Sequence, residues 1–477
     1  MPAPKREIYL LSPKQFSPET IAVAFAKTSR APESFREIVA ELSDEQSAQF
    51  HEKWVVGYGH ASVAEHAVLH LAIENASRLA MEAIESNRLA SYTEKSTRYQ
   101  KWDADNFYIP AELDGHALRD EYIATCRMLF ETYVAAQEPV RELVKQSAPR
   151  RENETDEAWD RRIRSQYVDV CRFLLPAAAL ANVGVTANGR VLESAIRKWN
   201  SSPLAEVREI GVSVKAAAKS EIPTLVKYAE PVEYLIETSN DLTSLVAEFN
   251  QKSKIKNQKS DDWCVLVDYD RDGEARVLAS ALYRFGEMSY SEALGLVKSV
   301  PDVAILADAL LKRLGRYDIP LRELEHSSYT FDLLMDQGAY AEFKRHRMMS
   351  QTPQLLTGAL GYAVPRRFVE AGFESEYRRA MDAAGALWQK LAAWNVDVAQ
   401  YVVPNGYNRR VLATFNLREA YAFCQLRAAA NAHFSMRRVA QRVAGEIGAV
   451  HPLLTKYLKL HAETWQGLEN EYFSALE

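Results

Sequence analysis

The feature of this sequence that most constrains its fold is a set of markers that occurs twice in the same order. Glu65-His66 is followed by an apolar run and then by Asn87-Arg88. Glu325-His326 is followed by a similar run and then by Arg345-His346-Arg347. The glutamates lie 260 residues apart, and the last arginines of the two sets lie 259 apart. A repeat at nearly constant spacing predicts two copies of one structural unit.

A second pair of markers lies further along each half. Leu175-Pro176 precedes Asn188-Gly189-Arg190, and Val403-Pro404 precedes Asn416-Leu417-Arg418. The asparagine follows the proline by twelve residues in both halves, and the two sets lie 228 residues apart. The second set therefore extends the repeat, although at a shorter offset than the first.

The change of offset locates extra residues in the first half, between Arg98 and Arg172, and the charged segment 150–164 is one candidate for the insertion. The chain has 477 residues, which is long for one domain and suits two. The polar stretch 250–262 is the best candidate for a linker. We therefore expect one domain at 1–249 and a second at 263–477.

Composition excludes several classes of protein. The residues are 47% hydrophobic and 26% charged, which is typical of a soluble globular protein, and the net charge of −6 gives no reason to expect a nucleic-acid partner. No apolar run predicts a membrane helix, and the N-terminal residues do not resemble a secretory signal. The cysteines have no paired spacing, which favours reduced thiols in the cytoplasm. They are Cys126, Cys171, Cys264 and Cys424.

The periodicity of apolar residues predicts an α+β fold with more helix than strand. A short apolar strand is expected to open each half, at Glu7–Leu11 and Val265–Asp268. Ala67–Ile73 and Tyr329–Leu334 have the length of strands, although periodicity leaves a helix open there. Long helical patterns cover Leu118–Val144, Ala205–Lys219 and Leu417–Val443.

Two local patterns suit an anion. In Arg345-His346-Arg347, two guanidinium groups offer planar, forked donors for phosphate, although the same triplet is common on a solvated helix edge. Glu94, Ser96 and Arg98 alternate, which would place them on one side of an extended segment. A serine and an arginine on one side suit a phosphate, but a surface strand edge has the same pattern.

Two residues near the end of the second half also have alternative interpretations. Asn416 with Glu419 three residues later predicts a helix N-cap with its capping box, which does not exclude contact with a ligand. Arg427 follows Phe423 and precedes Asn431 by one helical turn each, so it is expected to face a buried cleft. A buried arginine needs an anionic or carbonyl partner, which favours a role in ligand binding.

Other kinds of site have less support. His66 and His70 are four residues apart and could hold zinc if they lay on a helix, but no third ligand has a compelling spacing. No cysteine lies beside a recognisable base, which disfavours a thiol nucleophile. The GxGxxG loop of a Rossmann flavin site is absent from the sequence.

Taken together, the motifs resemble those of the flavin-dependent thymidylate synthases. The segment from His60 to His66 matches the family's His-x-Thr/Ser-x-x-Glu-His pattern. Arg345-His346-Arg347 matches the start of its arginine motif, and Ser96-Thr97-Arg98-Tyr99 matches the end of that motif. Each half also carries part of the C-terminal pattern, with Arg172 in the first half and Arg427 in the second. Each half departs from the family at positions that the other tends to keep; the departures are Ser86, Trp199, Leu355, Thr357 and Gln400.

The resemblance implies a tandem fusion of two such domains, with a mixed sheet and long helices. It implies methylation of deoxyuridylate (dUMP) at C5 to give dTMP, with methylenetetrahydrofolate as carbon donor and with FAD, reduced by NADPH, as hydride donor. It also implies a homodimer that rebuilds the family's four-domain assembly. Two alternatives remain open: a homologue that acts on another uracil-containing substrate, and a protein that keeps only the fold.

The resemblance also assigns roles to residues of both halves. Arg427 would be catalytic, touching nucleotide and flavin together. The nucleotide would be held by Glu94, Ser96, Arg98, Arg172, Arg345 and Arg427. The flavin would be bound by Ser29, Ser62, Glu65, Asn188 and Arg190 from the first half, and by Arg345, His346, Arg347, Asn416 and Arg418 from the second.

Overall fold

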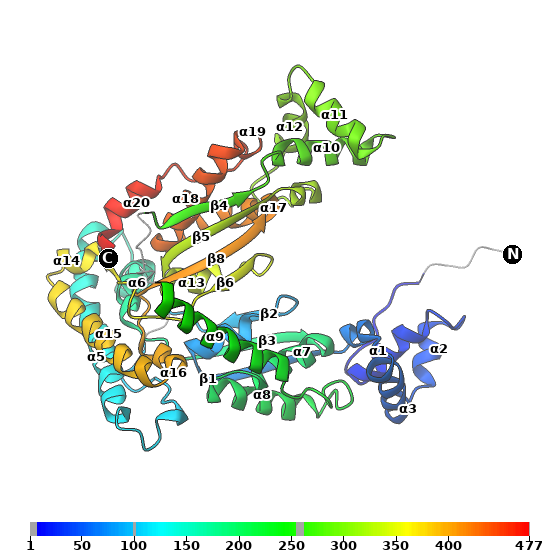
Figure 1. Ribbon diagram of the computed structural model, residues 1–477, viewed down its shortest axis with the longest axis horizontal. Helices are drawn as coiled ribbons and strands as arrows, with labels where there is room; N and C mark the ends of the chain where they lie inside the picture. Colours follow the sequence, from blue (N-terminus) through cyan, green and yellow to red (C-terminus); the bar gives the residue numbers. More distant parts are fainter. Residues whose placement is uncertain (1–6, 99–101, 254–261, 477) are drawn as a thin grey trace. The chain divides into compact units, whose positions relative to one another are not determined.

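A computed structural model describes residues 7–98, 102–253 and 262–476 (Figure 1). The chain divides into two compact units. Unit 1 comprises residues 1–95, 110–114 and 180–256, and unit 2 comprises the remainder. The described residues among 96–109 and 115–179 of the predicted first half thus belong to unit 2. The predicted domain boundaries follow the repeat in the sequence, and two domains at 1–249 and 263–477 remain a prediction. Residues 254–261 of the predicted linker lie outside the described residues.

Unit 1 contains a three-stranded antiparallel sheet with the strand order β1-β3-β2. Helices α4, α7 and α8 pack against it. The strands are β1 (Val68–Ser77), β2 (Ser91–Glu94) and β3 (Leu180–Asn188). The helices are α1 (Pro18–Lys27), α2 (Phe35–Ala40), α3 (Asp44–Phe50), η1 (His51–Gly57), η2 (Ala61–His66), α4 (Arg78–Glu85), η3 (Ala111–Leu113), α7 (Gly189–Asn200), α8 (Ala205–Ala218) and α9 (Glu233–Ser253).

Unit 2 contains a four-stranded antiparallel sheet with the order β4-β5-β8-β6, and α13, α17 and α18 pack against it. Its strands are β4 (Cys264–Tyr269), β5 (Ser328–Asp336), β6 (Ser350–Pro353), β7 (Ala363–Pro365), β8 (Asn408–Asn416) and β9 (Phe473–Leu476), of which β7 and β9 form a separate pair. Its helices are α5 (Arg119–Ser147), α6 (Asp156–Cys171), η4 (Arg172–Leu174), α10 (Gly273–Phe285), α11 (Tyr290–Ser299), α12 (Ala304–Leu311), η5 (Arg322–His326), α13 (Gln337–Phe343), α14 (Arg366–Glu370), α15 (Glu374–Trp394), α16 (Val396–Ala399), η6 (Gln400–Val402), α17 (Leu417–Arg427), α18 (Phe434–Val450), α19 (Pro452–Thr455) and α20 (Trp465–Tyr472).

The two sheets repeat the same strand pairing, register included. Val68 of β1 pairs with Asn188 of β3, and Ser328 of β5 pairs with Asn416 of β8. β2 pairs with β3 from Ser91, and β6 pairs with β8 at the equivalent position. The offsets of 260, 259 and 228 residues are those of the sequence markers. Because a one-residue slip would reverse every side chain, this shared register confirms the duplication and the α+β class.

A local two-fold symmetry relates the two copies within unit 2. Pro176 and Pro404 are equivalent positions of the repeat, and they form an antiparallel bridge with each other. The backbone hydrogen bonds around this bridge occur in symmetric pairs, as expected where two copies of one surface meet isologously. The pairs are Ala177 N–H to the Val403 carbonyl with Asn405 N–H to Leu175, and Ala178 N–H to Tyr401 with Gly406 N–H to Phe173.

Part of the extra length of the first copy lies in the helix before this bridge. α6 has 16 residues, whereas its counterpart α16 has 4. α6 overlaps the charged segment 150–164, so the insertion lies where the change of offset predicted it. The added helical turns are held in part by ion pairs, such as that between Arg162 and Glu154 at 2.8 Å.

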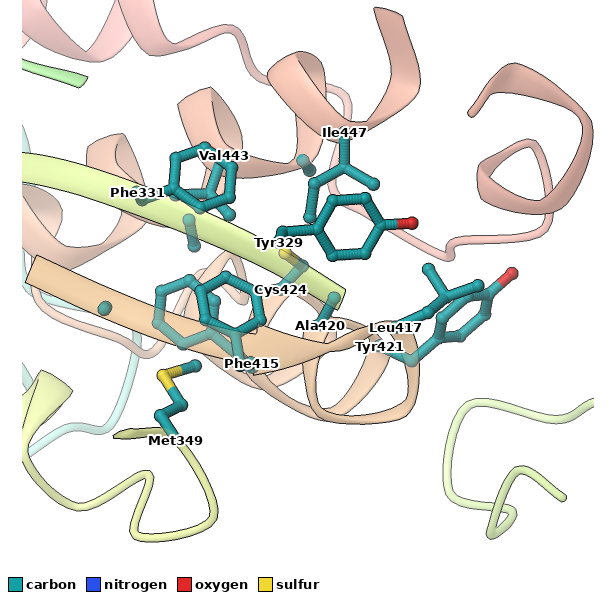
Figure 2. Close-up of a cluster of buried hydrophobic side chains, with 14 of the residues drawn as sticks. Tyr329, Phe331, Met349, Phe415, Leu417, Ala420, Tyr421, Cys424, Val443 and Ile447 are labelled. Atoms are coloured by element: carbon teal, nitrogen blue, oxygen red, sulfur yellow. The ribbon is translucent and has the colours of Figure 1, made fainter. Parts of the chain in front are cut away.

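The hydrophobic core of unit 2 fills the space between the sheet and the helices that follow β8. Phe331 of β5 and Phe415 of β8 stack with ring centroids 5.6 Å apart. Figure 2 shows these rings between Met349 and the α18 residues Val443 and Ile447, all of them buried. The alternation of buried residues along β5 and β8 explains why both segments form strands. The core thereby fixes the start of α17, whose last residue, Arg427, belongs to the candidate site.

Two predicted elements were wrong. Glu7–Leu11 forms no strand; Ile8 and Leu10 are exposed, because no neighbouring strand pairs with this segment. Leu417–Val443 is not one helix but α17 and α18, separated at residues 428–433. His433 ends the break by accepting a hydrogen bond from the Ser435 N–H at the start of α18. The other predicted strands and helices are confirmed within a few residues of their bounds.

Two further observations concern the membrane and the thiols. Within the described residues, no helix combines the length and apolar character needed to cross a bilayer. The four cysteines are buried and present as thiols. Burial raises the pKa of the Cys126 and Cys264 thiols to about 12, so neither is an activated nucleophile.

Candidate functional site

The candidate site lies in unit 2, where three predicted nucleotide-binding arginines come together. Arg98, which follows β2 in sequence, forms a forked ion pair with Asp169 of α6, with Nε–Oδ1 and Nη2–Oδ2 distances of 2.8 and 2.7 Å. Its Nη1 donates to the Asn431 carbonyl at 2.9 Å, in the break between α17 and α18. Arg98 of the first copy is therefore anchored to a carbonyl that lies four residues after Arg427 of the second.

A buried carboxylate, Glu342 of α13, joins the other two arginines. Arg427 Nη1 donates to Glu342 Oε2 at 3.0 Å, and Nη2 donates to the Glu342 carbonyl at 3.2 Å. Arg172 Nη2 lies 3.6 Å from Glu342 Oε1 and donates to the Gly338 carbonyl at 3.3 Å. The anionic and carbonyl partners expected for Arg427 are thus present. Arg172 and Glu342 are almost completely buried, whereas the Arg427 side chain remains 15% exposed.

His346 lies in the turn after α13, beside the same cluster. Its Nδ1 is 2.9 Å from Glu419 Oε1, and its Nε2 accepts a hydrogen bond from Arg427 Nε at 3.0 Å. The flanking residues Arg345 and Arg347 are respectively exposed and half-buried. The Arg-His-Arg triplet is therefore divided: its histidine faces the interior and its arginines reach the surface.

Burial dominates the electrostatics of this cluster. It lowers the pKa of the Arg172 and Arg427 guanidiniums, while the negative charges of Asp169 and Glu342 act in the opposite direction. Burial also lowers the pKa of His346 and, more strongly, that of His433, where the nearby positive charges of Arg172 and Arg98 add to the effect. The histidines are accordingly neutral at neutral pH, and the cluster's charge comes from its arginines and carboxylates.

The asparagine and arginine of each Asn-x-Arg motif have the same local contacts in both copies. Asn188 and Asn416 cap α7 and α17 by accepting hydrogen bonds from backbone N–H groups three residues later. Arg190 is paired with Glu65, and Arg418 Nη1 lies 2.7 Å from Glu325 Oε1. The N-cap prediction for Asn416 is confirmed, but its capping box was wrong, because the Glu419 carboxylate binds His346 instead.

The remaining predicted residues do not extend the cluster. Glu94 belongs to unit 1, where it is paired with Arg78 at 2.6 Å. Ser96 accepts a hydrogen bond from the Arg98 N–H at 3.2 Å. The segment turns at Thr97 and Arg98 rather than staying extended, which contradicts the alternation proposed for residues 94–98. Tyr99 lies outside the described residues.

The last two flavin candidates and the histidine pair lie in unit 1. Ser29 donates a hydrogen bond to the Ala26 carbonyl at the end of α1, and Ser62 is exposed on η2. His66 packs on Phe25, whereas His70 lies on β1 and is hydrogen-bonded to Thr186. The two histidines therefore do not share a helix, which removes the geometry on which a zinc site depended.

The first copy has uncharged residues at the two positions that are equivalent to Arg427 and Glu342. Trp199 stands at the position of Arg427, and Ala83 at that of Glu342. The Trp199 indole donates to the Ala83 carbonyl at 3.0 Å, and Arg427 Nη2 donates to the Glu342 carbonyl in the same way. Both copies thus keep the backbone contact between the two helices, and only the second keeps the charges.

The sequence motifs missed the acidic partners Asp169, Glu342 and Glu419. None of them belongs to an arginine motif, and the pairing of Asp169 with Arg98 joins positions 71 residues apart. Glu419 had a signal, but it was interpreted as a capping residue. Glu342 could have been found by comparing the copies, because a charge that replaces Ala83 on a buried helix face requires a partner.

Comparison with known proteins matches both halves of the chain. The family described as thymidylate synthase complementing protein matches residues 12–224 and 265–453. A UPF0159 protein of Chlamydia muridarum is 32% identical over 436 residues, covering 88% of this chain and 82% of its own length. A flavin-dependent thymidylate synthase of Clostridium tetani is 26% identical over 218 residues, covering 45% of this chain and 83% of its own length. One such synthase therefore corresponds to about half of this chain.

Among solved structures, a flavin-dependent thymidylate synthase from Helicobacter pylori in complex with FAD and dUMP aligns at 18% identity with a TM-score of 0.28. The alignment covers 41% of this chain and 99% of the solved one. The likeness is too low to establish a shared fold on its own, whereas the family match covers most of both copies. The chain belongs to the thymidylate synthase complementing protein family.

Proposed function

We propose that this protein is a flavin-dependent enzyme that methylates C5 of the uracil ring of dUMP, with methylenetetrahydrofolate as carbon donor and NADPH as reductant. The observation that carries the proposal is the convergence of Arg98, Arg172 and Arg427 in unit 2. The motifs that contain these arginines lie far apart in the sequence. Their resemblance to the family's nucleotide-binding residues was inferred from sequence alone, so the convergence in the structure is a separate observation. Family membership supports the same chemistry.

The arginines of the cluster offer donors to an anionic ligand. Asp169 and Glu342 lie beside these arginines, and Glu419 lies against the neutral His346. Three carboxylates thus balance the three guanidinium charges, and the cluster has no excess positive charge. The side chains of Arg98 and Arg427 are 17% and 15% exposed and would bind the nucleotide. An arginine beside the uracil would stabilise negative charge that develops on the ring. Arg427 is the residue to which we assign this role.

The outward side chains of the Arg-His-Arg turn support a role in FAD binding. Arg345 and Arg347 reach the surface of unit 2, and forked guanidinium donors suit a diphosphate. Bound FAD, once reduced, would supply the hydride that completes the methyl group. Glu65 with Arg190, and Glu325 with Arg418, would line the flavin sites of the two copies, and two chains would assemble into a four-domain homodimer.

A less charged uracil compound is a second candidate substrate. The nucleotide-binding arginines already have carboxylate partners, so a phosphate dianion would have to compete with them. Among the described residues, no donor lies within hydrogen-bond distance of Glu342 Oε1, which is buried. A buried acceptor of this kind favours a ligand that brings a donor, such as a hydroxyl group, rather than a second anion.

Binding and turnover measurements test the two candidates. Purified protein should take up FAD noncovalently and convert dUMP to dTMP when methylenetetrahydrofolate and NADPH are supplied. Arg347→Ala should weaken FAD binding by about 1.5–3 kcal/mol, because a charged hydrogen bond is lost. Arg379→Ala, at an exposed position on α15, is the matched control. Protein that binds no FAD in titration would contradict the proposal, and turnover of deoxyuridine without dUMP turnover would favour the second candidate.

A further inference from the structure

The hydrogen bonds around His346 determine where the ring carries its proton. A guanidinium Nε always bears hydrogen, and Arg427 Nε lies 3.0 Å from His346 Nε2. His346 Nε2 must therefore accept, which leaves the ring proton on Nδ1. From there it is donated to Glu419 Oε1, 2.9 Å away. Protonation of both ring nitrogens would bring two N–H groups face to face, which this geometry disfavours.

The ring has no further nitrogen with which to bind a ligand. Its side chain is 8% exposed, and its ring packs perpendicular to that of Phe423, with ring centroids 5.0 Å apart. The series continues by a hydrogen bond from Arg427 to Glu342, which in turn forms an ion pair with Arg172 at 3.6 Å. Every guanidinium nitrogen of Arg427 is used by this series, which restricts the side chain to one orientation.

The repeat provides an independent comparison, because each member of the series has an equivalent position in the other copy. Val191 corresponds to Glu419, Asn87 to His346, and Trp199 to Arg427. Ala83 corresponds to Glu342, and Gln400 to Arg172. In each pair, the residue that belongs to the series is charged or titratable, and the equivalent residue in the other copy is neutral. Four members of the series come from the second copy, and neutral residues replace all four in the first copy, so these four behave as a single device rather than as separate contacts. Arg172 is the member that comes from the first copy.

We propose that His346, held by Glu419 as the neutral Nδ1–H tautomer, is a positioning residue that orients Arg427 toward the uracil substrate and is not a ligand of the flavin. The proposal rests on the proposed function for the identity of the substrate. It changes the role that the family resemblance implied for His346. The nearby charged groups are Glu419 and Arg427 on α17, Glu342 on α13 and Arg345 in the same turn.

The tautomer can be measured without substrate or cofactor. In full-length protein labelled with ¹⁵N-histidine, the long-range proton–nitrogen spectrum distinguishes the two ring nitrogens, and the signals of His346 are those missing from the His346→Gln variant. We expect protonated Nδ1 and unprotonated Nε2 at neutral pH. An Nε2–H tautomer, or a doubly protonated ring, would overturn the proposal.

Variants then separate positioning of Arg427 from binding of flavin. His346→Gln can still donate to Glu419 and accept from Arg427, whereas His346→Leu can do neither. We expect the leucine variant to weaken dUMP binding about tenfold, equivalent to 1.4 kcal/mol, while FAD affinity is unchanged and the glutamine variant retains most dUMP binding. Asn87→Leu changes the equivalent residue of the first copy and is the matched control.

Two outcomes of the variant series would overturn the proposal. One is loss of FAD from His346→Leu with dUMP affinity intact, and the other is a glutamine variant as defective as the leucine variant. If wild-type protein binds no uracil compound, the proposed function fails, and the tautomer of His346 still decides whether the series of hydrogen bonds exists.

Discussion

At the scale of single residues, the buried Arg172 and the partly buried Arg427 share one carboxylate. Glu342→Ala would leave Arg172 and Arg427 without their shared counter-charge in a buried environment. Because the cost of an uncompensated buried charge is large, we expect the free energy of unfolding to fall by about 3 kcal/mol. Urea unfolding measures this, with Glu131→Ala on the exposed face of α5 as control. A loss below about 1 kcal/mol would show that the pairing is dispensable.

The buried histidines should make stability depend on pH. The pKa of His433 and that of His346 are lowered in the folded state, so the unfolded chain binds more protons as the pH falls below about 6.5. Stability should therefore decrease as the pH falls from about 6.5 toward the lowered pKa values. Urea unfolding across this range should show a shallower loss for His433→Asn than for wild type. Equal slopes would contradict the contribution of His433.

Sequence reasoning correctly predicted that Arg427 has an anionic or carbonyl partner, but it did not identify its partners, for a physical reason. An arginine between Phe423 and Asn431 at helical spacing must face the interior, and a buried guanidinium needs an acceptor. Which acceptor it finds depends on how α13 packs on α17, and no local pattern reports that packing. Glu342 and Asp169 were therefore visible only in the three-dimensional structure.

At the scale of secondary-structure elements, the asparagines of the two Asn-x-Arg motifs start equivalent helices. Asn416→Ala should reduce stability by about 1 kcal/mol, because the Glu419 N–H loses its capping acceptor. Asn416→Asp should be close to wild type, since aspartate caps equally well. The measurement is again urea unfolding, with FAD titration alongside it. An alanine variant of unchanged stability that loses FAD would show that this asparagine acts as a ligand rather than as a cap.

Strands and helices could be predicted from sequence where one face of the element packs on the core, because the apolar residues then recur with the period of a strand or a helix. β5 alternates buried and half-buried residues, and α5 follows one helical period, so both were identified from sequence. The break between α17 and α18 was missed because its residues, which include Ala428 and Ala429, are compatible with a helix. Contacts with distant segments, such as the bond from Arg98 to the Asn431 carbonyl, stabilise it instead.

At the scale of the whole molecule, duplication lets one copy lose what the other keeps. The symmetric bonds around Pro176 and Pro404 join residues of both copies within unit 2, so Arg98 and Arg172 can complete a cluster whose other members come from the second copy. The matching sequence markers predicted this sharing. The markers could not predict the division of the chain into two compact units, because they show which segments are related by duplication and not which segments pack together.

In the proposed function, one nucleotide site of this protein combines arginines from both copies. Calorimetric titration of dUMP into wild type, Arg98→Ala, Arg427→Ala and the double variant tests it most directly. Each single variant should lose most of the binding, and the double variant should be little worse, because both arginines act on one ligand. A mixture of the two single variants should not recover binding, since both residues lie in one unit of one chain. Wild-type affinity in either single variant, or losses that simply add in the double variant, would contradict the claim.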